Sequence, residues 1–290
     1  MMQFADSSIE NLWRDGQWTY IRKNVGEWRG WFRQFSPEAS WVKDTPSSLT
    51  LVEDRPNQHM TLVLKRTPEG KPTQTMEREL GYPGASPYIC FFPTGAFSQG
   101  AIQRRPWSNF GAEFSLLSEH RRMRLVQLYK GTASGEHTLD YVTLIPEYRA
   151  ASSTNKPVKP AAERLPLERL LGTWQGKSLY LPATMAAPVV GTSHWQAKSV
   201  GAELVISDNT STDETRWQSV APHRWQAGPR QYWLLPGDVS CTVYPQLPRD
   251  HSASLELCWY LSPHQRQRIM RDYDEQGNWL GTLLALETRV

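Results

Sequence analysis

A six-residue segment that occurs twice constrains this chain more than any other feature. Leu171–Gly176 reads Leu-Gly-Thr-Trp-Gln-Gly, and its earlier counterpart Val25–Gly30 reads Val-Gly-Glu-Trp-Arg-Gly. A Gly-x-Trp that opens an apolar, alternating segment is typical of the first strand of an up-and-down β-barrel, where glycine lets the backbone turn and the indole plugs the floor. We therefore expect two barrels, closed by Gly26 with Trp28 and by Gly172 with Trp174.

A second motif repeats at nearly the same distance. Leu-Ser-x-His-x-Arg-x-Arg occurs at Leu117–Arg124 and again, 144 residues later, at Leu261–Arg268, whereas the two tryptophans are 146 residues apart. The closing segments, 143–149 and 282–289, also share Thr-Leu, Glu and Arg in the same order. Ordered anchors of this kind predict a tandem duplication. We expect a first barrel with an N-terminal helical arm in residues 1–150, a linker in 151–164 and a second barrel in 165–290.

The pattern of apolar residues predicts an all-β, lipocalin-like (calycin-like) fold with short capping helices. Short helices are expected where Trp18, Ile21 and Val25 share a face, and again after Pro166. Eight or nine short strands with turn signals between them suit a closed antiparallel barrel, which has no exposed edge. In the first half we expect strands at Trp28–Phe35, Ser48–Glu53, Met60–Lys65, Tyr88–Phe92, Ala96–Gln103, Glu113–Ser118, Arg122–Tyr129 and Leu139–Ile145.

Composition and charge exclude several classes of function. Lys plus Arg number 32 against 29 Asp plus Glu, shared evenly by the two halves, so neither half has the basic excess of a nucleic-acid-binding protein. Three cysteines without a Cys-x-x-Cys spacing fit a reducing compartment. No apolar run reaches the roughly 20 residues of a membrane span, and no leader pattern opens the chain. We expect a cytoplasmic protein without membrane insertion, either free or at the cytosolic face of the thylakoid.

Two pairs of arginines are the candidate ligand-binding residues: Arg122 with Arg124, and Arg266 with Arg268. Residues two apart in a strand point to the same face. In one interpretation an arginine of each pair lies across the opening tryptophan, a cation–π contact worth about 0.5–2 kcal/mol. In the other, the paired guanidinium groups line a cavity and bind the carboxylate of an amphipathic ligand.

The remaining polar residues nominate neither a catalytic nor a metal site. His120 and His264 precede the arginine pairs, but no second ligand stands at metal spacing beside either, so a turn histidine is favoured over a haem ligand. The cysteines lie in apolar segments typical of core residues. We find no nucleophile elbow, phosphate loop, dinucleotide fingerprint or metalloprotease motif. The sequence therefore predicts a protein that is not an enzyme and has no cofactor.

The chain resembles a family of cyanobacterial two-barrel calycins. The motifs that carry the likeness are Asn24–Gly30, Ser36–Glu38, Gly95–Gly100, Gly111–Phe114, Arg122–Leu128 and, in the second half, Leu170–Gly176 with the closing strands. That family also includes a chloroplast biogenesis factor for ATP synthase. The chain is more distantly similar to lipocalin-fold phycobilin lyases, which transfer an open-chain tetrapyrrole to a phycobiliprotein.

The resemblance implies a non-enzymatic assembly factor of the photosynthetic apparatus, with ATP synthase head subunits as its protein partner. Two barrels would hold that partner through their exteriors and the groove between them, and 13 tryptophans with many arginines suit a protein-binding surface. The alternative is a binder or lyase of a bilin or another amphipathic carboxylate, which uses the arginine pairs. A third hypothesis is a haem barrel with His120 or His264 as ligand.

Overall fold

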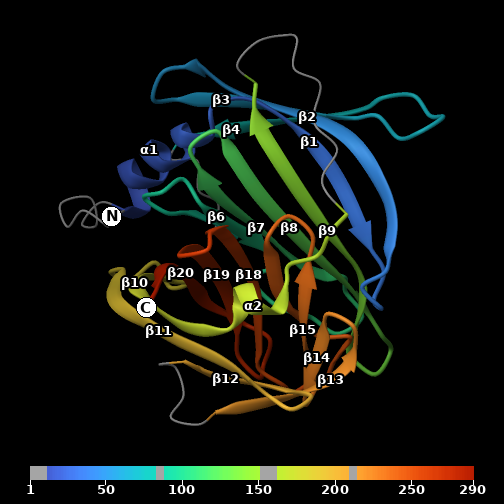
Figure 1. The fold of residues 1–290 in the computed structure, drawn as a ribbon. Coiled ribbons are helices and arrows are strands. Elements are labelled where there is room, and N and C mark those ends of the chain that lie inside the picture. Colours follow the sequence, from blue (N-terminus) through green and yellow to red (C-terminus); the bar gives the residue numbers. More distant parts are fainter. Residues whose placement is uncertain (1–11, 83–87, 151–161, 209–213) are drawn as a thin grey trace.

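The chain folds into two curled antiparallel sheets, one from each half, packed against each other (Figure 1). The computed structural model describes residues 12–82, 88–150, 162–208 and 214–290. Residues 151–161, most of the expected linker, lie outside this part of the chain. The all-β, two-barrel expectation is confirmed.

The first sheet has the order β4-β3-β2-β1-β9-β8-β7-β6-β5, and all its pairings are antiparallel. Its strands are β1 (Gly26–Phe35), β2 (Trp41–Arg55), β3 (His59–Arg66), β4 (Gln74–Gly81), β5 (Ile89–Phe91), β6 (Phe97–Gly100), β7 (Phe110–Ser118), β8 (Arg121–Gly131) and β9 (His137–Arg149). β1 joins β9, which curls the sheet. Its two ends, β4 and β5, are not paired with each other in the described residues, so the sheet is a curled half-barrel in that part of the chain.

The second sheet is a closed barrel. Around it run β10 (Gly172–Pro182), β11 (Val189–Val200), β12 (Glu203–Asp208), β13 (Thr215–Ala221), β14 (Arg224–Ala227), β15 (Arg230–Leu235), β16 (Val239–Val243), β18 (Ala253–Ser262), β19 (Gln265–Tyr273) and β20 (Trp279–Arg289). β20 returns to β10, which completes the circle. The remaining strand, β17 (Gln246–Leu247), leaves this barrel and pairs with β9 of the first sheet.

Short helices precede the first strand of each sheet, as the apolar spacing predicts. In the first half, η2 (Leu12–Gly16), α1 (Gln17–Ile21) and η3 (Arg22–Asn24) lead directly into β1. In the second half, Pro166 precedes α2 (Leu167–Leu170) in an extended conformation, which leaves the missing N–H of proline outside the helical hydrogen bonds.

Most expected strands are present, but β4 was not predicted. Its sequence, Gln-Thr-Met-Glu-Arg-Glu-Leu-Gly, is charged and almost wholly exposed, so it lacks the apolar alternation of a half-buried strand. The strand expected at Ala96–Gln103 is shorter than predicted, since β6 ends at Gly100.

The walls of the two sheets share one hydrophobic core. A single cluster of buried apolar side chains includes Phe110 and Tyr129 from the first sheet and Leu255 and Tyr273 from the second. The rings of Phe110 and Tyr273 meet edge to face, with centroids 5.0 Å apart. This packing fixes the barrels against each other, so the region where they meet is filled by side chains.

Polar groups also cross between the sheets. The Gln127 side chain donates to the carbonyl oxygen of Thr242 at 3.0 Å, and the Gln267 side chain donates to the carbonyl oxygen of Leu117 at 2.9 Å. The guanidinium of Arg271 donates to the carbonyl oxygen of Ala101 at 3.2 Å. Because these buried donors find their acceptors in the other sheet, separating the sheets would leave them unsatisfied.

Candidate functional site

Trp28, near the start of the first strand, is buried, and two arginines lie beside its ring. The guanidinium carbons of Arg122 and Arg149 each lie 4.4 Å from the ring centroid of Trp28. The indole N–H of Trp28 donates to the carbonyl oxygen of Asn24 at 2.9 Å, and Arg149 also donates to the carbonyl oxygen of Val25. The helix end, the first strand and the last two strands are thereby tied together at this point.

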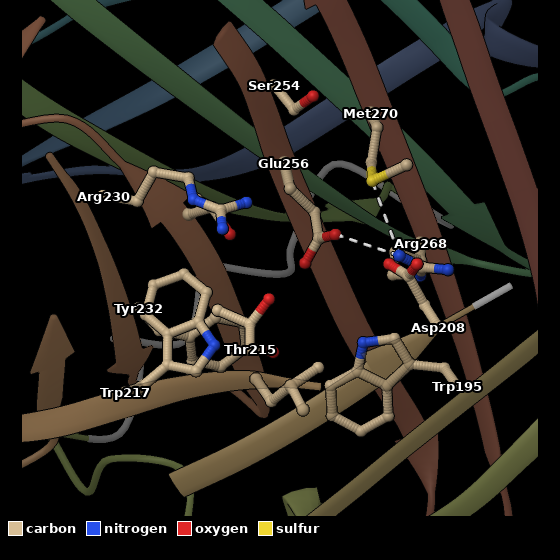
Figure 2. Close-up of a pocket in the computed structure, with 12 residues that line it drawn as sticks. Trp195, Asp208, Thr215, Trp217, Arg230, Tyr232, Ser254, Glu256, Arg268 and Met270 are labelled. Carbon is tan, nitrogen blue, oxygen red and sulfur yellow. Dashed lines mark hydrogen bonds and ion pairs between the residues drawn. The ribbon is translucent and has the colours of Figure 1, made fainter. Parts of the chain in front are cut away.

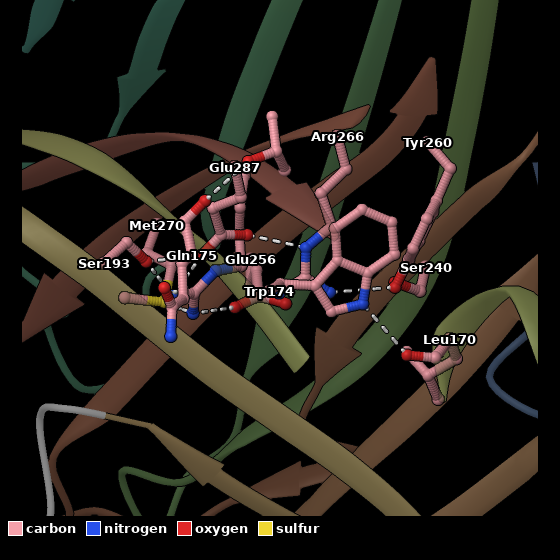
Figure 3. Close-up of polar contacts among 12 residues, drawn as sticks. Leu170, Trp174, Gln175, Ser193, Ser240, Glu256, Tyr260, Arg266, Met270 and Glu287 are labelled. Atoms are coloured by element: carbon pink, nitrogen blue, oxygen red, sulfur yellow. Dashed lines mark hydrogen bonds and ion pairs between the residues drawn. The ribbon is translucent and has the colours of Figure 1, made fainter. Parts of the chain in front are cut away.

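The second barrel repeats this arrangement around Trp174 (Figure 3). Arg266 lies 4.6 Å and Arg289 lies 5.8 Å from the ring centroid, and the indole N–H donates to the carbonyl oxygen of Leu170 at 3.3 Å. Arg122 and Arg266 therefore occupy the position over the opening tryptophan that the cation–π interpretation describes. At a buried site such a contact is worth about 2 kcal/mol.

Gly26 and Gly172 have the backbone conformation that this turn needs. Their φ angles are +121° and +111°, a region that side chains disfavour. A Cβ on Gly26 would lie 3.0 Å from Arg149 Nη1, and a Cβ on Gly172 would lie 3.0 Å from Arg289 Nε. Glycine at these two positions leaves room for the arginine beside each tryptophan.

In the first barrel, the charges of Arg122 and Arg124 are neutralised by glutamates. Glu147 accepts from Arg122 Nε at 2.7 Å and from Arg124 Nε at 2.9 Å, and Arg124 Nη1 reaches Glu113 at 2.7 Å. Burial alone would raise the pKa of Glu147, but attraction to the two arginines outweighs burial and lowers it. Glu147 is therefore ionised, and a ligand carboxylate would have to compete with it.

The second barrel contains the equivalent cluster of two arginines and two glutamates. Glu287 accepts from Arg266 Nε at 2.6 Å and pairs with Arg268 Nη2 at 3.4 Å, while Arg268 Nη1 pairs with Glu256 at 3.2 Å. Burial opposes ionisation of Glu287, but the two arginines outweigh it and lower the pKa to about 2. For Glu256, burial dominates over Arg268 and raises the pKa.

Sequence reasoning missed the role of the glutamates in these clusters. The repeated closing segments contained a signal for Glu147 and Glu287, which occupy matching positions before Arg149 and Arg289. Glu113 and Glu256 gave no matching signal, because a register shift between Tyr260 and Ser262 adds one residue between Glu256 and the repeated Leu-Ser motif. A β-bulge of this kind hides equivalent positions from a fixed spacing.

The first barrel encloses a largely apolar cavity of about 590 Å³. Leu49, Leu62 and Phe97 are among the apolar residues that line it, and Arg122 and Arg124 reach it. This volume lies within the range of pockets that hold drug-sized molecules. The ligand-binding role expected for Arg122 and Arg124 stays a prediction. Its structural support is that both side chains line this cavity.

The second barrel holds a smaller and more polar cavity of about 260 Å³. Figure 2 shows the side chains around it: the rings of Trp195, Trp217 and Tyr232 form part of the wall, and Glu256 and Arg268 project from neighbouring strands. Of the second arginine pair, only Arg268 lines this cavity. The two barrels thus share a buried tryptophan beside arginines and an ionic cluster, but their cavities differ in volume and polarity.

His120 and His264 lie on the surface, whereas the three cysteines are buried. His120 and His264 are exposed in turns, where their carbonyl oxygens accept from the backbone N–H of Arg149 and Arg289 respectively. The three cysteines are free and buried, and burial raises the pKa of each thiol, for Cys258 to about 12.

Within the described residues, no cluster of three or more His, Cys, Asp or Glu side chains could hold a metal ion. No helix in the same part of the chain is both long and apolar enough to cross a bilayer.

Each half of the chain matches a domain family found in other proteins. Residues 14–152 match the N-terminal part of the domain of unknown function DUF3598, and residues 161–290 match the C-terminal domain described as that of biogenesis factor required for ATP synthase 1. A crystal structure of a DUF3598 protein of unknown function from Nostoc punctiforme is 31% identical, with a TM-score of 0.81, over 94% of this chain and 99% of that chain.

A second solved structure shows a much weaker likeness. The S-type phycobiliprotein lyase CPES of Guillardia theta aligns over 100% of this chain and 98% of its own, but at 9% identity and a TM-score of 0.19. No curated protein is significantly similar to the chain.

Proposed function

Because the chain belongs to the DUF3598 family, and its second half matches a domain named for ATP synthase biogenesis, we propose that it is a non-enzymatic assembly factor for the ATP synthase catalytic head. The match of residues 161–290 is the observation that carries the proposal. The factor acts in the cytoplasm, free or at the cytosolic face of the thylakoid, through contacts with unassembled head subunits.

The pairing of the buried charges and the burial of the thiols favour a binding role over catalysis. The buried charges of both ionic clusters are paired within the chain, as Glu147 with Arg122 and Glu287 with Arg266 illustrate. Raised pKa values keep the buried thiols protonated, and therefore poor nucleophiles. Such groups hold the walls of a rigid frame in place and are not poised for proton or group transfer.

Exposed aromatic side chains provide contact points for a protein. Trp107 is 73% exposed and Trp41 is 58% exposed. Tryptophan is enriched among the residues that dominate binding energy at protein interfaces. Since the two sheets share a packed core, a partner is held by the outer surfaces of one body, which include the groove between the barrels.

Binding to purified head subunits tests this function. The full-length chain is mixed with each subunit and with their assembled complex, and the products are separated by size-exclusion chromatography. We expect co-elution with at least one unassembled subunit and reduced assembly of the head in a deletion strain. Failure to bind any head subunit, together with normal assembly in the deletion strain, would remove the proposal.

The second candidate is a bilin or another amphipathic carboxylate bound in the first barrel. The observation in its favour is the apolar cavity of about 590 Å³ with Arg122 and Arg124 beside it. Incubation with phycocyanobilin should then shift and intensify its visible absorbance, and an Arg124→Leu variant should reduce the change. An unchanged spectrum counts against this candidate. A haem barrel that uses His120 or His264 would show a Soret band.

A further inference from the structure

The first barrel has a second cavity, of about 380 Å³, at the end of β1 that lies away from Trp28. Gln34, the last residue but one of β1, lines this cavity, whereas Trp28 lies near the start of the strand. Phe32 and Val126 line both this cavity and the apolar cavity of about 590 Å³. The two spaces therefore adjoin.

Three cationic side chains line the smaller space, which we call the basic cavity. They are Lys43 of β2, Arg66 of β3 and Lys71 of the turn between β3 and β4. In the described part of the chain, no aspartate or glutamate is among the residues that line it. None of the three cations forms an ion pair with a carboxylate of the described residues. The basic cavity therefore carries positive charge that the chain itself does not neutralise.

The register of the strands brings polar side chains to one wall of this cavity. Lys43 lies opposite Gln34 of β1, and Gln34 lies opposite Thr143 of β9. Side chains at directly opposite positions of neighbouring strands share a face of the sheet. Arg66 of β3 likewise lies opposite Gln74 of β4. Five strands therefore hold this polar lining in fixed positions.

Hydrogen bonds in the turn between β3 and β4 hold Lys71 beside the strands. The backbone N–H of Lys71 donates to the carbonyl oxygen of Pro68 at 3.1 Å, and the hydroxyls of Thr67 and Thr73 are hydrogen-bonded at 3.0 Å. The backbone N–H of Thr67 also donates to the carbonyl oxygen of Pro46 in β2 at 3.0 Å. The turn that carries the third cation is thereby tied both to itself and to β2.

The acidic residues nearest in sequence do not neutralise the basic cavity. Asp44, which follows Lys43, pairs with Arg33 at 2.8 Å instead. Glu69, in the same turn as Lys71, is exposed and does not line the cavity. The ionic cluster beside Trp28 is different, since glutamates pair with its arginines. A cavity lined by charge of one sign concentrates ligands of the opposite sign.

The kinds of donor in the basic cavity suit a phosphate group. Besides the three cations, the hydroxyls of Thr45, Tyr141 and Thr143 are among its lining groups, and each hydroxyl can donate to an anionic oxygen. A phosphate group of a monoester carries about two negative charges and three acceptor oxygens at neutral pH. Arginine binds phosphate through parallel N–H donors, and lysine binds it as a point charge. A carboxylate has one charge and two oxygens, so it would satisfy fewer of these groups.

The size and the apolar part of the lining favour an organic phosphate over a bare ion. The cavity volume of about 380 Å³ is within the range of sites for small molecules. Phe32, Pro68 and Val126 provide apolar wall. The guanidinium carbon of Arg66 lies 5.5 Å from the ring centroid of Phe32, a cation–π contact that orients this arginine. A small organic group attached to the phosphate would therefore find both space and contacts.

We propose that the basic cavity binds the phosphate group of a phosphate monoester, held by Lys43, Arg66 and Lys71. This inference goes beyond the assembly function and does not depend on it. The same group occurs on free small molecules and on the headgroup of phosphatidic acid. The apolar cavity beyond Phe32 and Val126 is where the chains of such a lipid would lie. The experiment distinguishes these two sources.

Isothermal titration calorimetry of the full-length chain, in a phosphate-free buffer of low ionic strength, tests the inference. The probes are glycerol 3-phosphate, inorganic phosphate and glycerol. We expect glycerol 3-phosphate to bind, glycerol not to bind, and added sodium chloride to weaken the binding, because salt screens the cations. Co-sedimentation with phosphatidylcholine vesicles, with and without phosphatidic acid, is the second arm. Binding of glycerol 3-phosphate alone identifies a free small molecule, and binding that requires phosphatidic acid identifies the lipid.

Matched variants separate the basic cavity from the net charge of the chain. Arg66→Gln and Lys71→Gln should each weaken binding of the phosphate probe at least tenfold. Lys65→Gln is the control, because it removes the same charge from the preceding residue of β3, which is exposed and does not line the cavity. This control should leave binding unchanged. Near-ultraviolet circular dichroism of each variant checks that the fold is retained.

Two results would overturn the inference. In the first, neither glycerol 3-phosphate, inorganic phosphate nor the phosphatidic acid vesicles bind to the wild-type chain. In the second, Lys65→Gln weakens binding as much as Arg66→Gln does, so that the anion responds to overall charge and not to this cavity. Neither result affects the assembly function, which is tested with the head subunits themselves.

Discussion

Arg266 and Glu287 form an ion pair at 2.6 Å in which neither side chain is exposed to solvent. The equivalent pair in the first barrel, Arg122 with Glu147, lies at 2.7 Å and is also buried. Each arginine of these pairs stacks over the buried tryptophan of its first strand. The ionic cluster and this tryptophan are therefore one structural unit, kept in both copies of a duplicated fold.

Replacing the buried glutamate should destabilise the protein strongly. Glu287→Gln leaves Arg266 buried without its counter-charge, and removal of one partner of a buried pair costs about 3–5 kcal/mol. We expect a loss of this size in the free energy of unfolding in urea. The matched control is Glu214→Gln, which breaks the exposed pair with Lys198 and should cost less than about 1 kcal/mol. Equal effects of the two substitutions would contradict the role given to the cluster.

Stability should fall in acid through the same carboxylate. The pKa of Glu287 is lowered from its ordinary value of 4.5 to about 2 in the folded chain. Its ionised form therefore contributes stability above pH 4.5, and this contribution is lost as the pH falls from about 4.5 to 2. The difference in unfolding free energy between wild type and Glu287→Gln should shrink over this range. A difference that stays constant from pH 6 to 2 would argue against the lowered pKa.

Two glycines in the first strands should not tolerate a methyl group. A Cβ on Gly30 would lie 2.1 Å from the carbonyl oxygen of Pro146, and a Cβ on Gly176 would lie 1.8 Å from that of Leu286. Each Gly→Ala substitution should cost about 1–3 kcal/mol or more, measured by thermal denaturation. Gly81→Ala is the control, because a Cβ there meets nothing within 4 Å and should leave the melting temperature almost unchanged.

The two barrels should unfold together. Their shared core contains Phe110 packed on Tyr273, and Gln267 donates across the boundary. We expect tryptophan fluorescence and far-ultraviolet circular dichroism to report one coincident transition in urea. Gln267→Ala should lower the midpoint, since the carbonyl oxygen of Leu117 then loses its partner. Two well-separated transitions in the wild-type chain would show that the interface does not couple the barrels.

The sequence revealed the architecture because the duplication repeats residues with strong conformational or packing demands. Gly26 and Gly172 have a positive φ, and Trp28 and Trp174 are fully buried, so neither type is easily replaced. Periodicity found the strands whose side chains alternate between core and solvent. It missed β4, because nearly all side chains of this strand are exposed and therefore do not alternate between core and solvent.

The candidate site was less accessible to sequence reasoning. The position of Arg122 over a tryptophan was one of two interpretations, and spacing alone could not choose between them. Glu113 escaped notice because a bulge in the second copy shifts its equivalent, Glu256, by one residue. The order in which the strands pair could not be predicted either, since pairing between distant strands is a property of the folded chain.

Hydrogen–deuterium exchange of the full-length chain, with and without a purified head subunit, tests most directly whether this chain binds an unassembled ATP synthase head subunit. We predict that the subunit slows exchange in a surface segment and leaves exchange unchanged at β16, Val239–Val243, whose residues are all buried. Unaltered exchange throughout the described residues in the presence of each head subunit would contradict the account.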